Sequence, residues 1–352
     1  MRIEDRIKRA GLELGFSHVG IAPVHDFEDY EREVLGRPDY APFTSTEASL
    51  LRKIARTKTL NPDAQSVICA TLGFSDIAYP SDLSTSVARA YLSRTYTPPA
   101  NAQHGAQIEA FARSLEEMGL VVDRNQFNIP QRLACAEAGV VTLGRNNFAY
   151  TPEDGSFNIL VTFLTTTALE PDEPTWQCEC PDNCGLCIQA CPTHAIAAPR
   201  RLLMDRCILF NNQRFEPGAQ DTIWEEMGLR IHGCDECQLA CPRNHAVLQA
   251  PQRRDAFLET LAREFDLEKV LELDEEYYEA VVRPIMYNYI KDADIFRRNA
   301  AIALGNSGDP AHLPALRRAL DATDREPVRK AIAWAIRRLE QTEQSEARSA
   351  LA

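Results

Sequence analysis

The stretch CGLCIQACPTHAI, residues 184–196, carries three cysteines, the last directly before a proline. A second stretch, CDECQLACPRN at 234–244, repeats the same ending, Cys-x2-Cys-x3-Cys-Pro. Two thiolates at x2 spacing can wrap one corner of a metal–sulfur cluster, while the cysteine before proline points along a starting helix toward a neighbouring cluster. The repeated ending therefore predicts two metal centres, each of which takes its last ligand from the other motif.

Eight cysteines divide into two complete ligand groups under this crossed arrangement. Set one is Cys180, Cys184, Cys187 and Cys241, and set two is Cys191, Cys207, Cys234 and Cys237. Bacterial ferredoxins bind [4Fe–4S] clusters with such runs. Zinc is the alternative, but zinc sites do not require two Cys-Pro endings. Cys178 is an alternative first ligand of set one, and the spacing favours Cys180.

The bulk composition is that of a globular protein rather than a membrane or secreted one. The 352 residues are 45% hydrophobic and 25% charged, which is ordinary for two or three soluble domains. The start, MRIEDRIKRAGLELGF, lacks the apolar core of a signal peptide, so we expect a cytoplasmic location. In that reducing compartment Cys69 and Cys135 are predicted to be buried core thiols. The net charge of −13 argues against non-specific nucleic-acid binding by the whole surface.

The chain changes character twice. Residues 1–170 alternate helix and strand patterns, which predicts a layered α/β sheet domain. Residues 171–250 contain short segments rich in cysteine and proline, and such a region needs metal centres as staples. Residues 251–345 are helical, and FRRNAAIAL at 296–304 recurs as VRKAIAWAI at 328–336. This internal repeat is typical of paired-helix solenoids.

With both motifs in place, the sequence resembles the epoxyqueuosine reductases, a family of cobalamin-dependent iron–sulfur enzymes related to the reductive dehalogenases. The resemblance covers most of the chain and is weakest around 25–90. Its central segments are CGLCIQACPTHAI, MDRCILFNN at 204–212 and HGCDECQLACPRN at 232–244. On either side, it rests on GFSHVGIAPV at 15–24, AEAGVVTLGRNN at 136–147 and RRNAAIALGNSGDPAHLPALRRAL at 297–320.

The resemblance implies an architecture and a reaction. It implies a nitroreductase-like, cobalamin-binding α/β domain at 1–170, an inserted ferredoxin-like module with two [4Fe–4S] clusters at 171–250, and a HEAT-like helical region at 251–345. In the family the clusters deliver electrons one at a time to cobalamin, which drives removal of the epoxide oxygen of epoxyqueuosine in tRNA. The implied partners are tRNA, which the HEAT-like region helps to hold, and an electron donor of the flavodoxin or ferredoxin type. Complete cluster sets within one chain allow a monomer.

The proton donor has two candidates. The family carries an aspartate before its glycine-rich segment, and an ungapped count back from Gly139 places Asn125 there. Asp123 takes the position if two residues are inserted, and it follows an apolar strand-like run, where α/β sheets place functional groups. The alternative role of Asp123 is a helix cap or an exposed loop charge. Tyr150 is the second candidate, since a phenol can donate a proton.

The residues predicted to hold cobalamin are Arg132, Arg145, Asn146 and Asn147. Gly144-Arg145-Asn146 stands where the family has Gly-Lys-Asn, and amides there suit the amide side chains of a corrin. The alternative is an ordinary polar turn, with Arg132 on a helix surface. Tyr96 matches a family position loosely. His194 and His232 flank the cysteine motifs, and we expect them to pack near the clusters rather than bind metal.

Two further functions fit the same motifs. GRNNFAYTPEDGSF at 144–157 is similar to uncharacterised double-cluster relatives, so the same chemistry on a small organic substrate is one alternative. An electron-transfer protein that reduces a partner's corrinoid is the other. Segment 295–340 has nine basic and five acidic residues in an acidic chain. That asymmetry is compatible with phosphate contacts on one face, or with a solvated helical surface.

Overall fold

The computed structural model describes residues 1–46, 48–95, 102–125, 128–175, 180–215, 221–286 and 292–350. Tyr96 and Cys178, which the sequence singled out, lie outside these described residues. Within these ranges no helix is both long and apolar enough to cross a membrane.

A four-stranded antiparallel sheet lies at the centre of the N-terminal part, in the order β1-β2-β6-β3. Its strands are β1 (His18–Pro23), β2 (Ser66–Gly73), β6 (Asn158–Thr165) and the short edge strand β3 (Val122–Asp123). β1 needs a glycine at position 20, because a Cβ there would lie 2.1 Å from the Ala138 carbonyl oxygen. The predicted strands thus form one sheet, and β1 packs closely against the segment after helix α9 (Gln131–Glu137).

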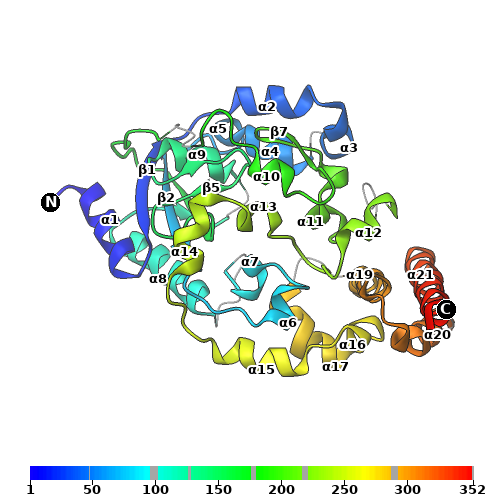
Figure 1. The fold of residues 1–352 in the computed structure, drawn as a ribbon. Helices are drawn as coiled ribbons and strands as arrows, with labels where there is room; N and C mark the ends of the chain where they lie inside the picture. The colour runs from blue at the N-terminus through cyan, green and yellow to red at the C-terminus, as the bar shows by residue number, and fades with distance from the viewer. Residues whose placement is uncertain are drawn as a thin grey trace.

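Helices cover both faces of this sheet because β2 alternates its side chains between them. Ile68 faces helices α1 (Ile3–Glu13) and α8 (Gln103–Glu117), where it shares a core with Phe111. Cys69 faces α9 on the other side. Cys69 and Cys135 are fully buried there, as the sequence predicted. Figure 1 shows this arrangement, with α1 and α8 near the N-terminus of the drawing.

Short elements fill the rest of the first 170 residues. The helices are α2 (Glu28–Leu35), α3 (Ala41–Thr44), α4 (Leu50–Ala55), α5 (Thr57–Leu60), α6 (Ser81–Ser84) and α7 (Arg89–Leu92). A two-stranded hairpin pairs β4 (Thr142–Leu143) with β5 (Ala149–Tyr150). This hairpin directly precedes β6 and faces the cysteine-rich part of the chain.

Over its described residues, the cysteine-rich part has no long element, as expected for a region held by metal centres. Its helices are α10 (Leu186–Gln189), α11 (Ile208–Asn211), α12 (Trp224–Met227), α13 (Glu236–Leu239) and α14 (His245–Gln249). A small hairpin pairs β7 (Ile196–Ala198) with β8 (Arg201–Leu202). Helices α10 and α13 each carry the middle cysteine of a Cys-x2-Cys-x3-Cys-Pro run, and they contact each other.

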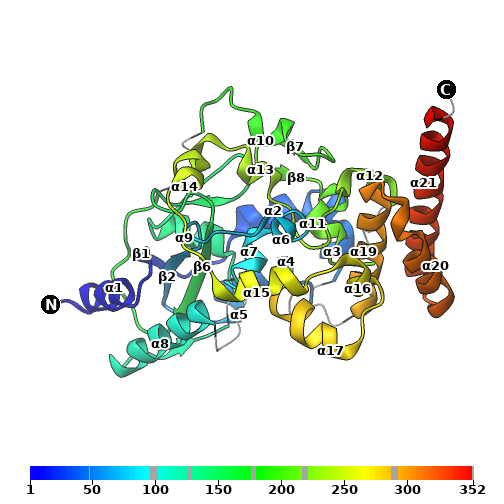
Figure 2. The same ribbon diagram turned by 60° about the horizontal axis from the view of Figure 1, so that its bottom comes forward.

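The C-terminal part is helical, and the predicted repeat forms a layer at one end of the molecule (Figure 2). Its helices are α15 (Ala256–Glu264), α16 (Leu267–Leu271), α17 (Glu275–Tyr277), α18 (Arg283–Met286), α19 (Ala293–Ser307), α20 (Leu313–Ala322) and α21 (Glu326–Ala350). The two repeated segments fall in α19 and α21. These helices touch closely, since a Cβ on Gly305 would lie 2.8 Å from the Ala335 Cα.

The largest core cluster joins all three predicted sequence ranges. Phe157 comes from the first range, Ile208 and Met227 from the second, and Phe296 from the third. The combination of sheet domain, cysteine-rich module and helical region is the predicted architecture. The domain boundaries at 170 and 250 stay a prediction, because one continuous core crosses both.

Candidate metal centres

Set one is gathered in space although its cysteines come from both motifs. Burial raises the pKa of Cys187, and the neighbouring thiols of Cys241, Cys184 and Cys180 raise it further. Cys241 follows Cys187 by more than fifty residues, so the tertiary fold brings the last member of the second motif to the first motif. This is the crossed grouping expected from the spacing. The assignment of each thiol as a ligand stays a prediction.

Set two is gathered next to set one. Burial raises the pKa of Cys237, and the thiols of Cys234, Cys207, Cys191 and Cys187 raise it further. Cys187 belongs to set one, so the two sets are neighbours. Mainly through burial, the pKa of Cys234 rises to about 12. Thiols in such surroundings stay protonated until a metal displaces the protons, so metal binding here is coupled to proton release.

Neither set is arranged round a single point. A zinc ion needs its thiolates about 2.3 Å from one metal atom. Within the described ranges, no three His, Cys, Asp or Glu side chains form a group that could hold one metal ion. The arrangement therefore differs from a preformed single-ion site.

Helix α19 holds the backbone around set two. Arg298 is 3% exposed and donates to the carbonyl oxygens of Arg214 and Asn211, the latter at 2.6 Å. Its neighbour Asn299 donates to the Asn212 carbonyl at 2.7 Å and to the Ile231 carbonyl at 2.9 Å. These carbonyls flank the segments that carry Cys207 and Cys234. Burial lowers the pKa of Arg298 to about 10, so the guanidinium stays charged at neutral pH.

The β4–β5 hairpin lies beside both sets. Tyr150 is 2% exposed, and its Oη accepts a hydrogen bond from Asn146 Nδ2 at 2.8 Å. The Asn146 amide also donates to the Cys237 carbonyl at 3.2 Å, and burial and the nearby Cys241 thiol raise the pKa of Tyr150. The Arg243 guanidinium covers the Tyr150 ring at 4.1 Å. Tyr150 and Asn146 therefore connect this hairpin to ligands of both sets.

A second polar group behind the hairpin was not foreseen from the sequence. Ser156 Oγ donates to Gln238 Oε1 at 3.0 Å and accepts from Asn244 Nδ2 at 2.8 Å. The Ser156 amide donates to Asn244 Oδ1 at 2.9 Å. All three side chains are buried. The sequence feature that could have indicated this group is the pair Arg243-Asn244, which directly follows the second Cys-Pro. Polar side chains there begin a new helix beside the metal centre.

Three of the predicted cofactor residues, Arg145, Asn146 and Asn147, lie in the turn between β4 and β5. The fourth, Arg132, contacts this turn from α9. Arg132, from α9, donates through Nη1 to the Asn147 carbonyl at 3.0 Å. The Arg145 carbonyl accepts from the Arg200 amide, between β7 and β8, at 2.7 Å. Asn147 has φ +68°, in the left-handed region that asparagine tolerates better than most residues.

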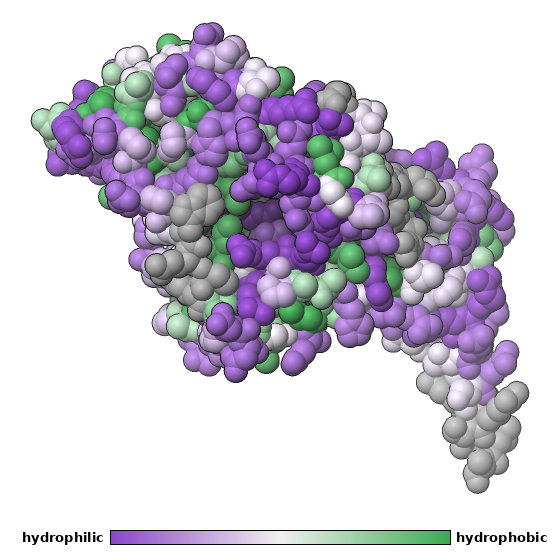
Figure 3. All heavy atoms as spheres, turned by 90° about the horizontal axis from the view of Figure 1, so that it is seen from above, coloured by the Kyte–Doolittle hydropathy of each residue, from purple (hydrophilic) through white to green (hydrophobic). Residues whose placement is uncertain are grey.

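This turn also contains a buried donor with nothing to bond. Within the described part of the chain, Arg145 Nε is buried and has no hydrogen-bond partner. Buried donors normally find an acceptor, so this one points to a ligand with polar oxygen atoms. The face of the molecule that carries α2 is hollowed, and hydrophilic side chains predominate around the hollow (Figure 3).

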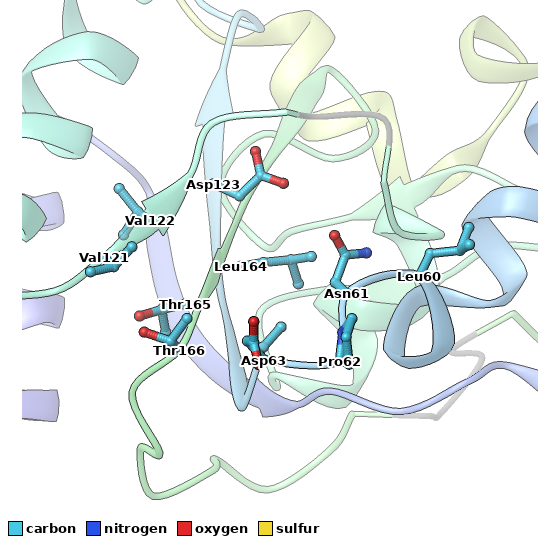
Figure 4. A pocket seen from close by; sticks show the side chains of 11 residues that line it. Leu60, Asn61, Pro62, Asp63, Val121, Val122, Asp123, Leu164, Thr165 and Thr166 are labelled. Atoms are coloured by element: carbon cyan, nitrogen blue, oxygen red, sulfur yellow. The ribbon is translucent and has the colours of Figure 1, made fainter.

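Asp123 lies elsewhere. It is exposed on the edge strand β3, and its carboxylate accepts from the Asn125 amide at 2.9 Å and from Asn128 Nδ2 at 2.7 Å. It lines a pocket of about 350 Å³ together with Asn61 and Asp63 from the loop after α5 (Figure 4). The carboxylate closes a turn, which is the loop role that the sequence left open.

The two predicted proton donors are far apart. Asp123 pairs with Leu164 near the end of β6, whereas Asn158 at its start donates to the Ala149 carbonyl beside Tyr150. With about 3.3 Å per strand residue, these positions are separated by roughly 20 Å. The structure therefore does not bring Asp123 and Tyr150 to one place.

The two histidines beside the motifs differ. His232 is fully buried against the Tyr91 ring, with ring centroids 4.1 Å apart, and burial lowers its pKa to about 3. It packs near the metal centre as a neutral ring, in agreement with expectation. His194 is exposed, with φ +51°.

The basic residues of the helical region are largely engaged in ion pairs. Arg317 meets Glu340 at 2.8 Å, and Arg318 meets Glu272 at 2.9 Å. Three further pairs are Arg325–Asp292, Lys330–Asp221 and Arg338–Glu225. The excess positive charge of segment 295–340 is thus partly balanced by acidic residues from neighbouring elements.

Comparison with known proteins identifies the cysteine-rich and helical parts. Residues 179–244 match the 4Fe–4S double cluster binding domain, and residues 282–352 match HEAT repeats. An epoxyqueuosine reductase from Vibrio cholerae is 28% identical over 353 residues, covering 98% of this chain and 93% of the relative.

Solved structures share the fold over nearly the whole chain. The epoxyqueuosine reductase from Streptococcus thermophilus aligns with a TM-score of 0.80 at 20% identity, covering 97% of this chain and 91% of that one. An epoxyqueuosine reductase crystallised with an epoxyqueuosine-modified tRNA-Tyr stem loop aligns with a TM-score of 0.73 at 21% identity, covering 96% and 99%.

Proposed function

Because this chain belongs to the epoxyqueuosine reductase family, we propose that it is an oxidoreductase that removes the epoxide oxygen of epoxyqueuosine in tRNA. The reaction takes two electrons and two protons, and the oxygen leaves as water. Two [4Fe–4S] clusters suit this chemistry, since each carries one electron at a time. We place the reaction in the cytoplasm.

The observation that carries the proposal is the pair of neighbouring four-thiol sets. The other three thiols of its own set raise the pKa of Cys187, and the other three thiols of its own set, together with Cys187, raise the pKa of Cys237. Clusters bound there would be close neighbours, and electrons would pass from one to the other inside the protein.

Cobalamin is the proposed acceptor of these electrons. When bound, it would supply a cobalt centre that accepts single electrons from the clusters and reduces the epoxide. The residues of the polar turn fit its many amide groups: Arg145 offers a buried, unpartnered Nε, and Asn147 is held in place by Arg132. We propose that Arg132, Arg145, Asn146 and Asn147 hold it, with Asn146 acting through its contacts to the cluster ligands.

Proton delivery has two proposed candidates whose surroundings differ. Asp123 is exposed and lines a pocket, so its carboxyl group can exchange protons with solvent. Tyr150 is buried, and burial together with the nearby Cys241 raises its pKa well above the ordinary value. A phenol that holds its proton so firmly is a poor acid, so Asp123 is the better candidate.

The HEAT-like helices are the proposed tRNA contact. A related enzyme was crystallised with a modified tRNA stem loop, and the present helical region shares that fold. The arginines of α20 and α21 are long side chains at the surface whose ion pairs are solvent-exposed. Such pairs are weak and can exchange a carboxylate for a phosphate.

The decisive experiment uses the anaerobically purified protein, reconstituted with iron, sulfide and cobalamin, and a chemical reductant. Its substrate is tRNA from a strain that lacks the reductase, and nucleosides are analysed by mass spectrometry. We expect epoxyqueuosine to disappear and queuosine to appear. A protein that holds both clusters and cobalamin yet leaves epoxyqueuosine intact would show that the substrate is a different one.

Replacement of Asp123 tests the proton donor. We expect Asp123→Asn to lower turnover by about 100-fold or more, because a general acid contributes roughly that much. Asp63→Asn is the matched control, since it removes a carboxylate from the same pocket and should leave turnover unchanged. Equal turnover for Asp123→Asn and the unmodified protein would exclude the aspartate as donor.

A further inference from the structure

Arg298 is a buried cation whose hydrogen bonds all go to neutral oxygen atoms. Its Nη1 donates to the Arg214 carbonyl, and its Nη2 donates to the Asn211 carbonyl at 2.6 Å. Its Nε and Nη2 also donate to Asn299 Oδ1, at 3.0 Å and 2.8 Å. These oxygens satisfy the donors of the guanidinium but carry no charge that balances it.

The carboxylates at the start of α19 belong to other arginines. Asp292 caps the helix and pairs with Arg325 at 3.1 Å, and Asp294 pairs with Arg297 at 2.7 Å. Over the part of the chain that the structure describes, no carboxylate oxygen lies within ion-pair distance of the Arg298 guanidinium. The charge of Arg298 is therefore buried without an acidic partner among these residues.

Two other arginines beside set two do have acidic partners. Arg89 Nη1 lies 3.5 Å from Asp235 Oδ2, and Arg230 pairs with Glu236. Both acids stand between the cysteines of the second Cys-x2-Cys turn. A buried charge is costly unless an opposite charge compensates it. Arg298 therefore requires an anion that the described side chains do not supply.

The segment that Arg298 holds carries a thiol of set two. Asn211, whose carbonyl accepts from Arg298, comes one helical turn after Cys207, and its backbone N–H donates to the Cys207 carbonyl at 2.9 Å. The side chain of Asn211 donates to the same carbonyl at 3.0 Å. Since one turn rises about 5.4 Å, the guanidinium lies on the order of 10 Å from the Cys207 thiol.

Asn299, the next residue of α19, extends this connection to Cys234. Its side chain donates to the Asn212 carbonyl at 2.7 Å. The Asn212 side chain accepts from the Gly233 N–H at 3.3 Å and donates to the Gly233 carbonyl at 3.4 Å. Gly233 directly precedes Cys234. Hydrogen bonds therefore fix Arg298 relative to both segments that present these thiols.

From this geometry we infer that the set two cluster is the anion that compensates Arg298, and that the buried guanidinium raises the reduction potential of this cluster. Four thiolate ligands make the cluster an anion, and reduction adds one more negative charge. A fixed cation nearby stabilises the reduced cluster more than the oxidised one. At an effective dielectric constant of about 20, a charge on the order of 10 Å away changes the one-electron reduction equilibrium roughly tenfold, or about 59 mV.

The test is a redox titration of the reconstituted full chain with dithionite, followed by electron paramagnetic resonance. We expect Arg298→Gln to make the midpoint potential of the set two cluster more negative by about 59 mV, with a smaller shift for set one. Arg298→Lys keeps the charge and should keep the set two potential near that of the unmodified protein. Cys187→Ser, which removes set one, identifies the set two signal.

The matched control is Arg297→Gln, which removes a positive charge from the same helix. Arg297 donates to the Leu273 carbonyl and pairs with Asp294, so its contacts lie within the helical region. We expect it to shift neither potential. An unchanged set two potential in Arg298→Gln with full iron content would overturn the inference. A potential in Arg298→Lys as negative as in Arg298→Gln would do the same, because the hydrogen bonds rather than the charge would then be responsible.

A second pair of variants keeps the result interpretable if Arg298→Gln loses iron. The Phe215 ring centroid lies 5.1 Å from Arg298 Cζ. Phe215→Glu places a carboxylate beside the guanidinium, whereas Phe215→Gln places an uncharged amide of the same shape there. We expect the set two potential to be more negative in Phe215→Glu than in Phe215→Gln. Equal potentials in these two variants would contradict the inference.

This inference rests only on the iron–sulfur part of the proposed function. The titration contains neither cobalamin nor tRNA. A protein that fails to convert epoxyqueuosine can still show the Arg298 effect, and an active enzyme can lack it. The two failures are therefore distinguishable.

Discussion

The two cysteine sets are neighbours, yet different parts of the molecule hold them. The β4–β5 hairpin of the sheet domain lies beside both sets: Tyr150 is near Cys241 of set one, and Asn146 donates to the Cys237 carbonyl of set two. Set two leans on α19 of the helical region, through Arg298 and Asn299. The hairpin therefore contacts the module beside two of its cysteines, whereas α19 holds the backbone on either side of Cys207 and Cys234.

These contacts explain how a region with little core of its own keeps a defined position. The sheet domain and the helical region both form hydrogen bonds to the cysteine-rich module, and the crossed ligands join its two motifs. Loss of the contacts from one of these two regions should therefore affect one cluster more than the other. The relative position of the two clusters therefore depends on both the sheet domain and the helical region.

The largest effect should come from the cysteines, which test the crossed grouping. We expect Cys191→Ser and Cys207→Ser to leave the same residual cluster, although they come from different segments. Cys187→Ser and Cys241→Ser should leave the other one. Iron should fall from about eight to about four atoms per chain in each case, since each [4Fe–4S] cluster carries four. Iron analysis and electron paramagnetic resonance measure both.

An uncrossed arrangement makes the opposite prediction. Cys191→Ser would then resemble Cys187→Ser, because both cysteines lie in the first motif. That result would contradict the assignment of the cysteines to two crossed sets.

The next largest effect on stability should come from the hydrogen bonds that Arg298 donates to the backbone around set two. Arg298→Ala removes the donor to the buried Asn211 carbonyl and to the Arg214 carbonyl, so we expect a loss of about 3 kcal/mol in stability. Cluster two should also be lost more readily than cluster one. Arg317→Ala is the matched control: this arginine belongs to the same region but forms an exposed ion pair with Glu340, worth under about 1 kcal/mol. Anaerobic thermal denaturation and iron content are the measurements.

The smallest effect should come from the polar group behind set one. Ser156→Ala removes a buried partner of both Gln238 and Asn244, which should cost about 1–3 kcal/mol. Ser114→Ala on α8, whose hydroxyl bonds only its own helix turn, should stay within about 0.5 kcal/mol. If both substitutions had the same small effect, this polar group would contribute nothing measurable to stability.

Much of the fold could be predicted from local patterns. The strand at 66–73 is an apolar run with several β-branched residues. The repeat at 296–304 and 328–336 lies in α19 and α21, as expected. Periodicity is a property of neighbouring residues, so it needs no knowledge of the rest of the chain. The antiparallel pairing of β1, β2 and β6 depends on distant residues, and the pattern does not contain it.

The candidate site was predictable to a different extent in its two halves. Cysteine spacing indicated both sets, because ligand geometry imposes a local rule on the sequence. The surroundings of Tyr150 were not predictable, since Asn146 and Cys237 are 91 positions apart. The placement of Asp123 at the far end of β6 from Tyr150 is likewise a result of strand register.

The sequence by itself determined which thiols can share a cluster, because a Cys-x2-Cys turn and a following proline restrict the backbone over a few residues. Only the tertiary structure decided what touches those thiols. A hydroxyl from β5, a guanidinium from α19 and a serine before β6 reach the module across long stretches of chain. Hydrogen bonds of this kind are set by packing, and packing is a property of the whole fold.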